Sequence, residues 1–175
     1  MTNFKKNDIF EAEVLDLTHE GQGVVKIDSF PFFVDNALPG ERIKMHVLKV
    51  GKSFGFGRVD EFISQSKHRV TQLNLDYLRT GIADFGHLSY DEQVKFKHKQ
   101  VVDILRKTAG KSDYPVLPVV EAIKTINYRN KAQIPVQMVD GLLTTGFYRK
   151  NSHTLIPVED FYIQHPEICL LYTSP

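Results

Sequence analysis

Short stretches of alternating apolar and polar residues run through the first sixty positions of the chain. In residues 10–14, for example, apolar side chains alternate with glutamates, as expected for a strand with one buried face. Glycine-rich bends separate these stretches, at Gly21–Gly23 and Gly51 among others. Such short strands and bends are typical of a small closed or nearly closed barrel of the OB type. The predicted strands are 10–14, 24–27, 30–34, 42–47 and 54–59.

A helical periodicity begins near residue 90. Ser89 is followed three residues later by Glu92, which is a capping-box signature, and apolar residues then recur at helical spacing as far as Ala109. Gly110 ends this pattern. We therefore predict a helix over 90–109, and its lysines and arginines are most simply interpreted as a solvated face.

Strand patterns return after the prolines at positions 115 and 118. We predict strands at 119–123, 131–139 and 142–148. The dipeptide Asp140-Gly141 lies between the last two and is a strong signal for a β-hairpin. Together with the preceding helix, these strands predict an α+β second half.

The charge of the chain is balanced overall but uneven along the sequence. The formal net charge of the 175 residues is +1. Between Arg42 and Arg58, however, there is no acidic residue, and this stretch also contains Lys44, Lys49 and Lys52. On a strand that alternates as 42–47 does, the apolar side chains share one face and the cations the other. One edge of the predicted barrel is therefore expected to be basic.

Several classes of protein are disfavoured by composition. No apolar run approaches the length of a membrane span, and the N-terminus does not lead into an apolar signal core, so we expect a cytoplasmic protein without a membrane partner. Cys169 is the single cysteine and cannot form an internal disulfide. No cysteine and histidine pair lies at structural-zinc spacing, so we expect no zinc site.

Three motifs in the first sixty residues resemble those of a TRAM domain, the small RNA-binding barrel of several RNA-modifying enzymes. They are Gly21–Val24, Pro31–Val34 and Leu38–Lys44, in that order and at that spacing. The second half resembles the middle domain of the TRAM-bearing uracil-C5 methyltransferases that act on ribosomal RNA. The segments that carry this second resemblance are His87–Gln93, Tyr128–Gln133, Gly146–His153 and Ile163–Glu167.

The sequence departs from this family where many members hold an iron–sulfur cluster. Their Cys-Gly-Gly-Cys motif corresponds to Thr80–Ala83 here, and two further cluster cysteines correspond to positions near Asn74 and near Phe161. Such a cluster needs several thiolates, which one cysteine cannot supply. The resemblance, with these departures, implies no iron–sulfur cluster and no other metal.

The family's catalytic domain has no counterpart in these residues. That domain is Rossmann-like and carries a glycine-rich loop for S-adenosylmethionine, a cysteine nucleophile and a carboxylate base. No strand-to-helix glycine loop occurs here, and Cys169 has no matching motif around it. The resemblance therefore implies the RNA-binding N-terminal portion of an S-adenosylmethionine-dependent uracil-C5 methyltransferase of ribosomal RNA. This portion would contain no catalytic and no cofactor-binding residue and would be inactive alone.

Cationic and aromatic residues of the predicted barrel are the first candidates for RNA contacts. OB-type barrels hold single-stranded RNA with cations that follow the phosphates and with aromatic faces on which bases stack. Phenylalanines in a small barrel usually fill its core, and we expect Phe32 and Phe33 to alternate between inside and outside. Phe54 and Phe56, flanked by small residues, are better candidates for an exposed face. The predicted set is Arg42, Lys44, Lys49, Lys52, Phe54, Phe56 and Arg58.

A second group of candidates lies on and beside the predicted hairpin. The resemblance implies that this region faces the substrate RNA, and arginine suits that role because its guanidinium can bridge phosphate oxygens or stack on a base. An ordinary charged surface is the alternative, and His153 could equally be a buried hydrogen-bonding residue. The predicted set is Tyr128, Arg129, Lys131, Arg149 and His153.

These expectations combine into one domain organisation. We predict an all-β, OB-like (TRAM) barrel over 1–62, a connection over 63–79 and an incomplete α+β middle domain over 80–175. The expected partner is RNA, with ribosomal RNA favoured. The alternative function is that of a stand-alone RNA-binding protein without catalytic activity.

Overall fold

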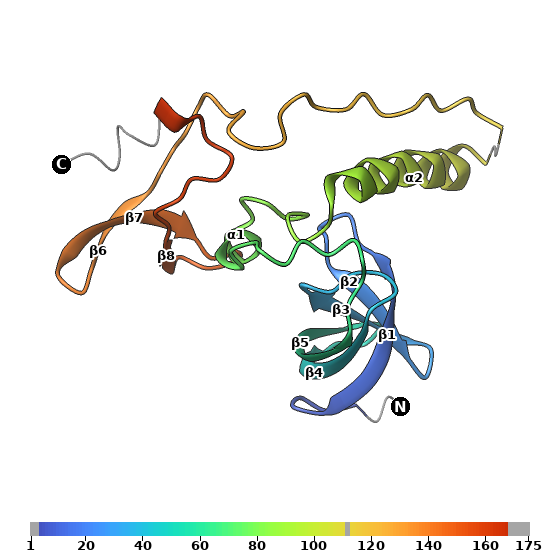
Figure 1. Ribbon diagram of the computed structural model, residues 1–175. Helices are drawn as coiled ribbons and strands as arrows, with labels where there is room; N and C mark the ends of the chain where they lie inside the picture. The colour runs from blue at the N-terminus through green and yellow to red at the C-terminus, as the bar shows by residue number, and fades with distance from the viewer. Residues whose placement is uncertain (1–3, 111–112, 168–175) are drawn as a thin grey trace. The chain divides into compact units, whose positions relative to one another are not determined.

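Five strands close into a barrel at the start of the chain (Figure 1). The computed structural model describes residues 4–110 and 113–167. Around the barrel the order is β1-β2-β3-β5-β4; β3 and β5 are parallel, and the other pairs, including the closing pair β4–β1, are antiparallel. The predicted OB-like barrel is confirmed. Its strands are β1 (Ile9–Leu17), β2 (Gly23–Ile27), β3 (Phe30–Asp35), β4 (Arg42–Val50) and β5 (Gly55–Ser64).

The barrel interior is filled by alternate residues of these strands. On β3, Phe32 is completely buried and Phe33 is only half-buried, which confirms the expected alternation. Phe4 and Phe30 pack their rings against Phe32, each at a centroid distance of 5.3 Å. The buried core consists of Val14, Val25, Phe30, Phe32, Val34, Ala37, Ile43, Met45 and Val47.

Glycines take two inward positions of β5 because larger side chains from neighbouring strands already occupy the space. A Cβ atom at Gly55 would overlap the ring of Phe32, and one at Gly57 would overlap the side chain of Met45. Since side chains alternate along a strand, the intervening Phe56 points outward. The glycines thus explain how a phenylalanine of this strand comes to lie outside the core.

The barrel unit extends beyond the residues of its last strand. It comprises the chain up to Thr71 together with His87–Gln93, so the predicted boundary at residue 62 falls inside it. Arg69 holds this extension in place, because its Nε and one terminal nitrogen donate to the two carboxylate oxygens of Glu41 at 2.6 and 2.7 Å. Arg69 also forms a β-bridge with Leu88. The residues after β5 are therefore part of the barrel's packing rather than a free connection.

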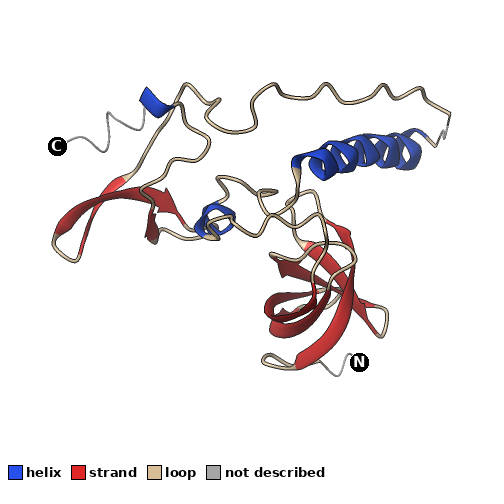
Figure 2. Cartoon of the chain, in the orientation of Figure 1, coloured by secondary structure: helices blue, strands red, loops and turns tan. Residues whose placement is uncertain are grey.

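The second unit contains helical segments and a small antiparallel sheet; Figure 2 draws helices in blue and strands in red. The sheet has the order β6-β7-β8, and Asp140 and Gly141, both at positive φ, form the turn between β6 and β7. The predicted hairpin is confirmed, as is the helix, whose observed bounds equal the predicted ones. The elements are α1 (Asp76–Thr80), α2 (Tyr90–Ala109), β6 (Val136–Val139), β7 (Leu142–Tyr148) and β8 (Leu155–Pro157). Helix α2 begins in the first unit and continues in the second.

Two strand predictions in the second half were wrong. Residues 119–123 form no strand, and the predicted strand 131–139 is reduced to its last four residues. Pro115 and Pro118 remove backbone donors beside the first of these segments, and no sheet edge of the described chain reaches it. Apolar composition was therefore insufficient, because a strand needs a partner. The short elements α1 and β8 were not predicted.

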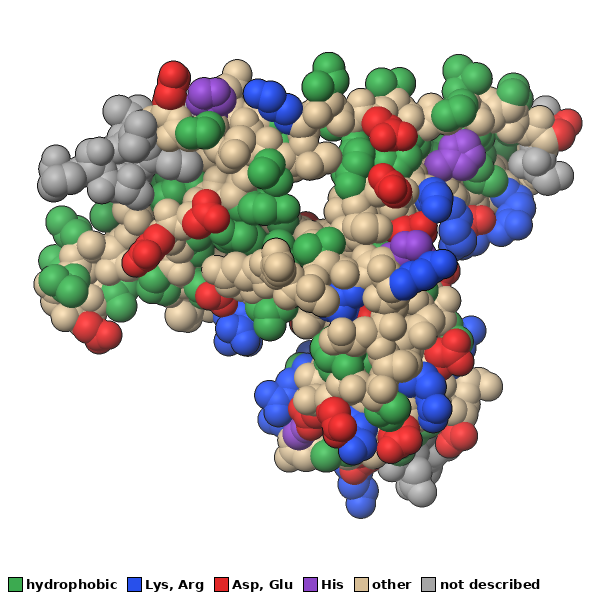
Figure 3. Space-filling model, viewed as in Figure 1, with side chains coloured by type: hydrophobic (Ala, Val, Ile, Leu, Met, Phe, Trp, Pro, Cys, Tyr) green, Lys and Arg blue, Asp and Glu red, His purple; other side chains and the backbone are tan. Residues whose placement is uncertain are grey.

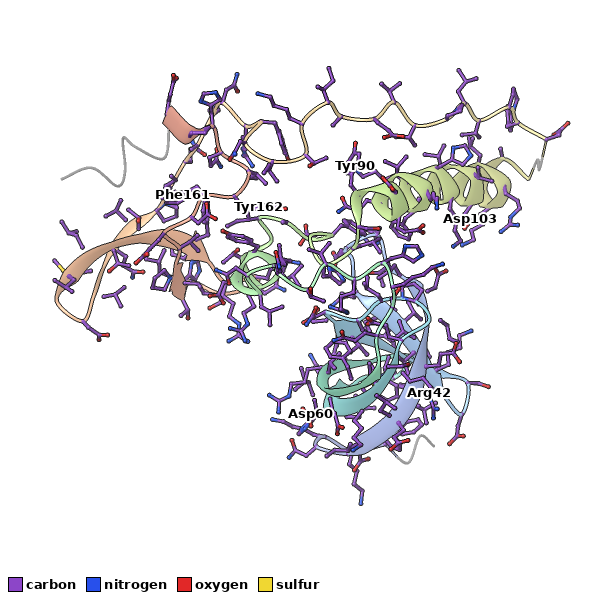
Figure 4. All side chains as sticks on the ribbon, in the orientation of Figure 1. Arg42, Asp60, Tyr90, Asp103, Phe161 and Tyr162 are labelled. Atoms are coloured by element: carbon purple, nitrogen blue, oxygen red, sulfur yellow. The ribbon has the colours of Figure 1, made fainter. Side chains whose placement is uncertain are left out.

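Tyr77 fastens α1 to a later segment of the second unit. Its hydroxyl donates to the backbone carbonyl of Asp160 at 2.7 Å, and its ring stacks on Tyr162 at 5.2 Å. Phe161, labelled with Tyr162 in Figure 4, is buried and packs edge-on against Phe147 of β7. These aromatic contacts form the small core that joins α1, the sheet and residues 158–163.

We expect Tyr77 to ionise well above an ordinary tyrosine. Burial, followed by the proximity of Asp160, raises the pKa of Tyr77 to about 12 from a usual value of 10.0. The neutral phenol is favoured in the folded state, so its contribution to stability is complete below pH 10 and is lost as the pH rises towards 12. An alkaline titration followed by tyrosinate absorbance should show a late step that is missing in Tyr77→Phe. Identical titration curves for the two proteins would contradict this assignment.

Candidate nucleic-acid interface

Two cations in the first half of β4, Arg42 and Lys44, lie opposite glutamates of neighbouring strands. Arg42 is opposite Glu13, and Lys44 is opposite Glu11 on one side and Glu61 on the other. The Lys44 ammonium is 2.7 Å from a carboxylate oxygen of Glu61. The hydrogen bond and charge of Glu61 together raise the pKa of Lys44 above its usual value of 10.5. Much of the basic character expected for this strand is therefore neutralised by residues distant in sequence.

A second ion-pair network surrounds Arg58 on the outer face of β5. Its Nε is 3.1 Å from Asp60, which also lies 3.1 Å from the Nδ1 of His46. Arg58 is opposite Asp35 on β3. Figure 4 labels Arg42 and Asp60 on the barrel, and Figure 3 shows Lys or Arg and Asp or Glu atoms intermingled over the barrel face in view. The Arg58 guanidinium is thus a partly compensated charge.

Lys49 and Lys52 differ from these residues because no carboxylate offsets them. Lys49 lies near the end of β4, opposite the outward Phe56, and Lys52 lies in the turn between β4 and β5. Both side chains are exposed, and within residues 4–110 and 113–167 neither forms an ion pair. Lys26 on β2 shares this property, although the sequence did not single it out. These three lysines are the cations best placed to meet an anionic ligand.

An aromatic cluster lies beside the unpaired lysines. Phe33, Phe54 and Phe56 contact one another with ring centroids 5.4 to 6.0 Å apart. Phe33 of β3 is directly opposite Phe56 of β5, and Phe56 is opposite Lys49 of β4. Phe54 is 43% exposed, whereas the other two rings are half-buried. The expected exposed position of Phe54 is confirmed, Phe56 is less exposed than expected, and Phe33 joins the group because parallel pairing of β3 with β5 brings it there.

We name this surface the aromatic face and define it by Phe33, Phe54, Phe56, Lys26, Lys49 and Lys52. Strand pairing brings these residues together: Val24 of β2 lies opposite Phe33 of β3, Phe33 opposite Phe56 of β5, and Phe56 opposite Lys49 of β4. Lys26 is two residues after Val24 on β2. The face combines apolar rings with uncompensated positive charge. That combination suits a ligand that offers both flat apolar surfaces and negative groups.

In the second unit the candidate residues are exposed but divided between two sites. The backbone of Arg129 forms an isolated β-bridge with Gln164. The Nε of Arg129 donates to the carbonyl of Lys131 at 3.1 Å, which fixes the direction of the arginine side chain. Tyr128 and Lys131 are exposed on either side of it. This group of three therefore forms one local surface on the strand-like segment that precedes β6.

The other candidates lie at the turn between β7 and β8. The Arg149 amide donates to the carbonyl of Thr154 at 2.9 Å, and His153 packs edge-on against Tyr148. Arg149 and His153 are exposed, so the alternative interpretation of His153 as a buried residue was wrong. The adjacent Lys150 forms an ion pair with Asp84. The turn thus presents an arginine and a histidine to solvent.

Potential metal-ligating side chains do not cluster among the described residues. No group of three potential ligands gathers within them, and Cys169 lies outside the described residues. Thr80 donates its hydroxyl to the Asp76 carbonyl. Within the described segments, no helix is long and apolar enough to cross a membrane.

Comparison with known proteins shows that most of this chain is similar to part of RNA methyltransferases. Residues 4–59 match the TRAM domain. The chain is 55% identical over 164 residues to an uncharacterised RNA methyltransferase of Streptococcus mutans and 56% identical over 163 residues to one of Streptococcus agalactiae. These matches cover 94% and 93% of this chain. The chain spans about a third of the length of these curated relatives, 36% in each case.

The fold is also similar to part of a solved methyltransferase. The crystal structure of Pyrococcus abyssi tRNA (uracil-54, C5)-methyltransferase, in complex with S-adenosyl-L-homocysteine, matches 93% of this chain and 34% of its own, with a TM-score of 0.63. The two sequences are 20% identical, so this likeness concerns the fold. The barrel, the sequence identity to the streptococcal proteins and this shared fold agree. Residues 4–59 thus match a TRAM domain, and over the region that it spans the chain is similar to RNA methyltransferases.

Proposed function

We propose that this chain is the RNA-binding portion of a methyltransferase that modifies C5 of uracil in ribosomal RNA. The observation that carries the proposal is the aromatic face, where Lys49 and Lys52 have no ion-pair partner among the described residues and adjoin Phe54 and Phe56. Lysines without a compensating carboxylate can neutralise phosphates and release their counterions, which supports RNA binding. Arg58 borders this face and adds a partly compensated charge.

The methylation itself is assigned to the remaining two-thirds of the relatives' length. S-adenosylmethionine would supply the methyl group there. We infer that the present chain holds the substrate and does not carry out the chemistry. In the second unit, Arg129 and Arg149 are proposed as further phosphate contacts because both guanidinium groups lie on exposed surfaces.

A comparison of two double variants tests which cations bind RNA. Lys49→Ala/Lys52→Ala removes uncompensated charges, whereas Arg42→Ala/Lys44→Ala removes charges that lie beside glutamates. Binding to ribosomal RNA fragments should be measured across a salt series. The first variant should bind more weakly, and its logarithmic salt dependence should be shallower by roughly 0.7 per lost phosphate contact. The second variant should change much less.

The matched variants also define what would contradict the proposal. Both remove two positive charges from the same barrel, so a general loss of net charge affects them equally. If both weaken binding to the same extent, the attraction is diffuse and the aromatic face has no special role. If the unmodified chain binds no ribosomal RNA fragment at any salt concentration, the RNA-binding function itself is wrong.

A further inference from the structure

We propose that Phe54, supported by Phe33 and Phe56, stacks on an unpaired base, so that the aromatic face selects single-stranded over duplex RNA. This inference rests on the proposed RNA-binding function and adds the kind of RNA and the residues that distinguish it. The three rings are outside the barrel core, which Phe4, Phe30 and Phe32 already fill. A cluster of three aromatic rings on an outer face is not needed to complete the interior.

The arrangement of the rings leaves one of them available. Phe54 stands nearly perpendicular to Phe56, with an interplanar angle of 87° and a centroid distance of 5.5 Å. Phe33 contacts both other rings from the neighbouring strand. Phe54 is therefore held from two sides by half-buried rings while 43% of its own surface remains exposed. A ring held in this way can accept a base with little further loss of side-chain freedom.

The backbone of the adjacent turn also holds Phe54 in position. The amide of Gly51 donates to the carbonyl of Phe54 at 2.8 Å, which closes the turn between β4 and β5. A Cβ atom at position 51 would lie 2.9 Å from the same carbonyl oxygen, so glycine allows this close approach. Lys52 lies within the turn and Lys49 just before it. The turn thus places two cationic groups shortly before the ring in the sequence.

This combination favours an unpaired nucleotide over a base pair. In an A-form duplex the base faces are stacked on one another, and a protein reaches mainly the backbone and the groove edges. An unstacked base offers a flat face to Phe54 while its neighbouring phosphates meet the lysines. Stacking on an aromatic side chain is tolerant of base identity, so the aromatic face should distinguish strandedness more than sequence.

A tryptophan at position 54 would report stacking directly. The chain contains no tryptophan, so Phe54→Trp introduces a single reporter into the full chain. Addition of a single-stranded oligoribonucleotide should quench its fluorescence, and the same strand annealed to its complement should quench it much less. Phe54→Ala should weaken binding to the single strand about 5- to 100-fold and binding to the duplex little.

Ile63→Ala is the matched control for loss of an exposed apolar side chain. Ile63 is 41% exposed and belongs to β5, but it lies at the opposite end of that strand from the three rings. This variant should bind both RNAs as the unmodified chain does. Equal thermal unfolding of the two alanine variants would show that the barrel remains folded in each.

The outcomes separate this inference from the function on which it rests. Salt-dependent binding with no quenching of the Phe54→Trp reporter, and with equal affinity of Phe54→Ala for both RNAs, would overturn the stacking site and leave RNA binding intact. Complete lack of binding by the unmodified chain would overturn both. Quenching by single strands, together with a selective loss of single-strand affinity in Phe54→Ala, would establish the stacking site.

Discussion

Replacing Arg69 by methionine should lower the free energy of unfolding of the barrel unit by about 3–5 kcal/mol. Arg69 is 5% exposed at its side chain and its partner Glu41 is completely buried. The variant would leave the Glu41 carboxylate in the interior without its counter-charge. It would also remove the donors to the Asn36 side chain and carbonyl, both at 2.9 Å, and the cation over the Phe62 ring. Urea denaturation of the full chain measures the loss.

A second-site variant tests the cause of this instability. Glu41 accepts hydrogen bonds from the amides of Leu38 and Ser66 as well as from Arg69. Glu41→Gln removes the charge but keeps one acceptor oxygen, so it should recover part of the stability lost in Arg69→Met when the two are combined. Lys44→Met breaks an exposed ion pair and should have a far smaller effect. An Arg69→Met loss no larger than that control would disprove the role of the buried pair.

Phe32→Ala is expected to cost the barrel about 3–5 kcal/mol, because it removes a large side chain from a closely packed interior. Phe32 is fully buried and contacts the rings of Phe4 and Phe30. Its ring also occupies the space next to Gly55. Because glycine has no side chain, residue 55 cannot fill the cavity that alanine would leave at position 32. The free energy of unfolding should be measured by denaturant titration.

Phe54→Ala provides the opposite pattern of effects. It removes the same number of atoms from the outer face, where 43% of the side chain is already exposed, so it should lower stability much less than Phe32→Ala. A large loss of stability is expected only for Phe32→Ala, whose ring lies in the core. A large loss of RNA binding is expected for Phe54→Ala, whose ring lies on the outer face. Equal destabilisation by the two variants would mean that the outer rings are part of the core.

Local patterns predicted those elements that their own residues define. The helix over 90–109 has a capping signature at one end and a glycine at the other, and both adjoin the segment itself. The hairpin at Asp140-Gly141 is likewise encoded in two adjacent residues with positive φ. Residues 119–123 failed as a strand because pairing requires a second segment, and no local pattern supplies it.

The sequence predicted the candidate site as a set of basic and aromatic residues. Which of these residues remain available to a ligand depends on their neighbours on adjacent strands. Lys44 and Lys49 are equally basic in the sequence, yet only Lys44 meets a carboxylate, because Glu61 lies opposite it on β5. Phe33 was expected only to alternate with Phe32 between inside and outside, and the sequence did not relate it to Phe54 and Phe56. These distinctions follow from strand register, which is set by closure of the barrel.

The sequence by itself determined the barrel class, the helix, the hairpin and the resemblance to TRAM-bearing methyltransferases, because alternation, capping and turn residues act over a few positions. Only the tertiary structure decided which cations remain uncompensated and which rings form one surface. Electrostatic and stacking interactions depend on distances of a few ångströms between residues that are far apart along the chain. The parallel pairing of β3 with β5 created the aromatic face, and the Arg69–Glu41 pair extended the barrel unit past the residue at which its strand pattern ends.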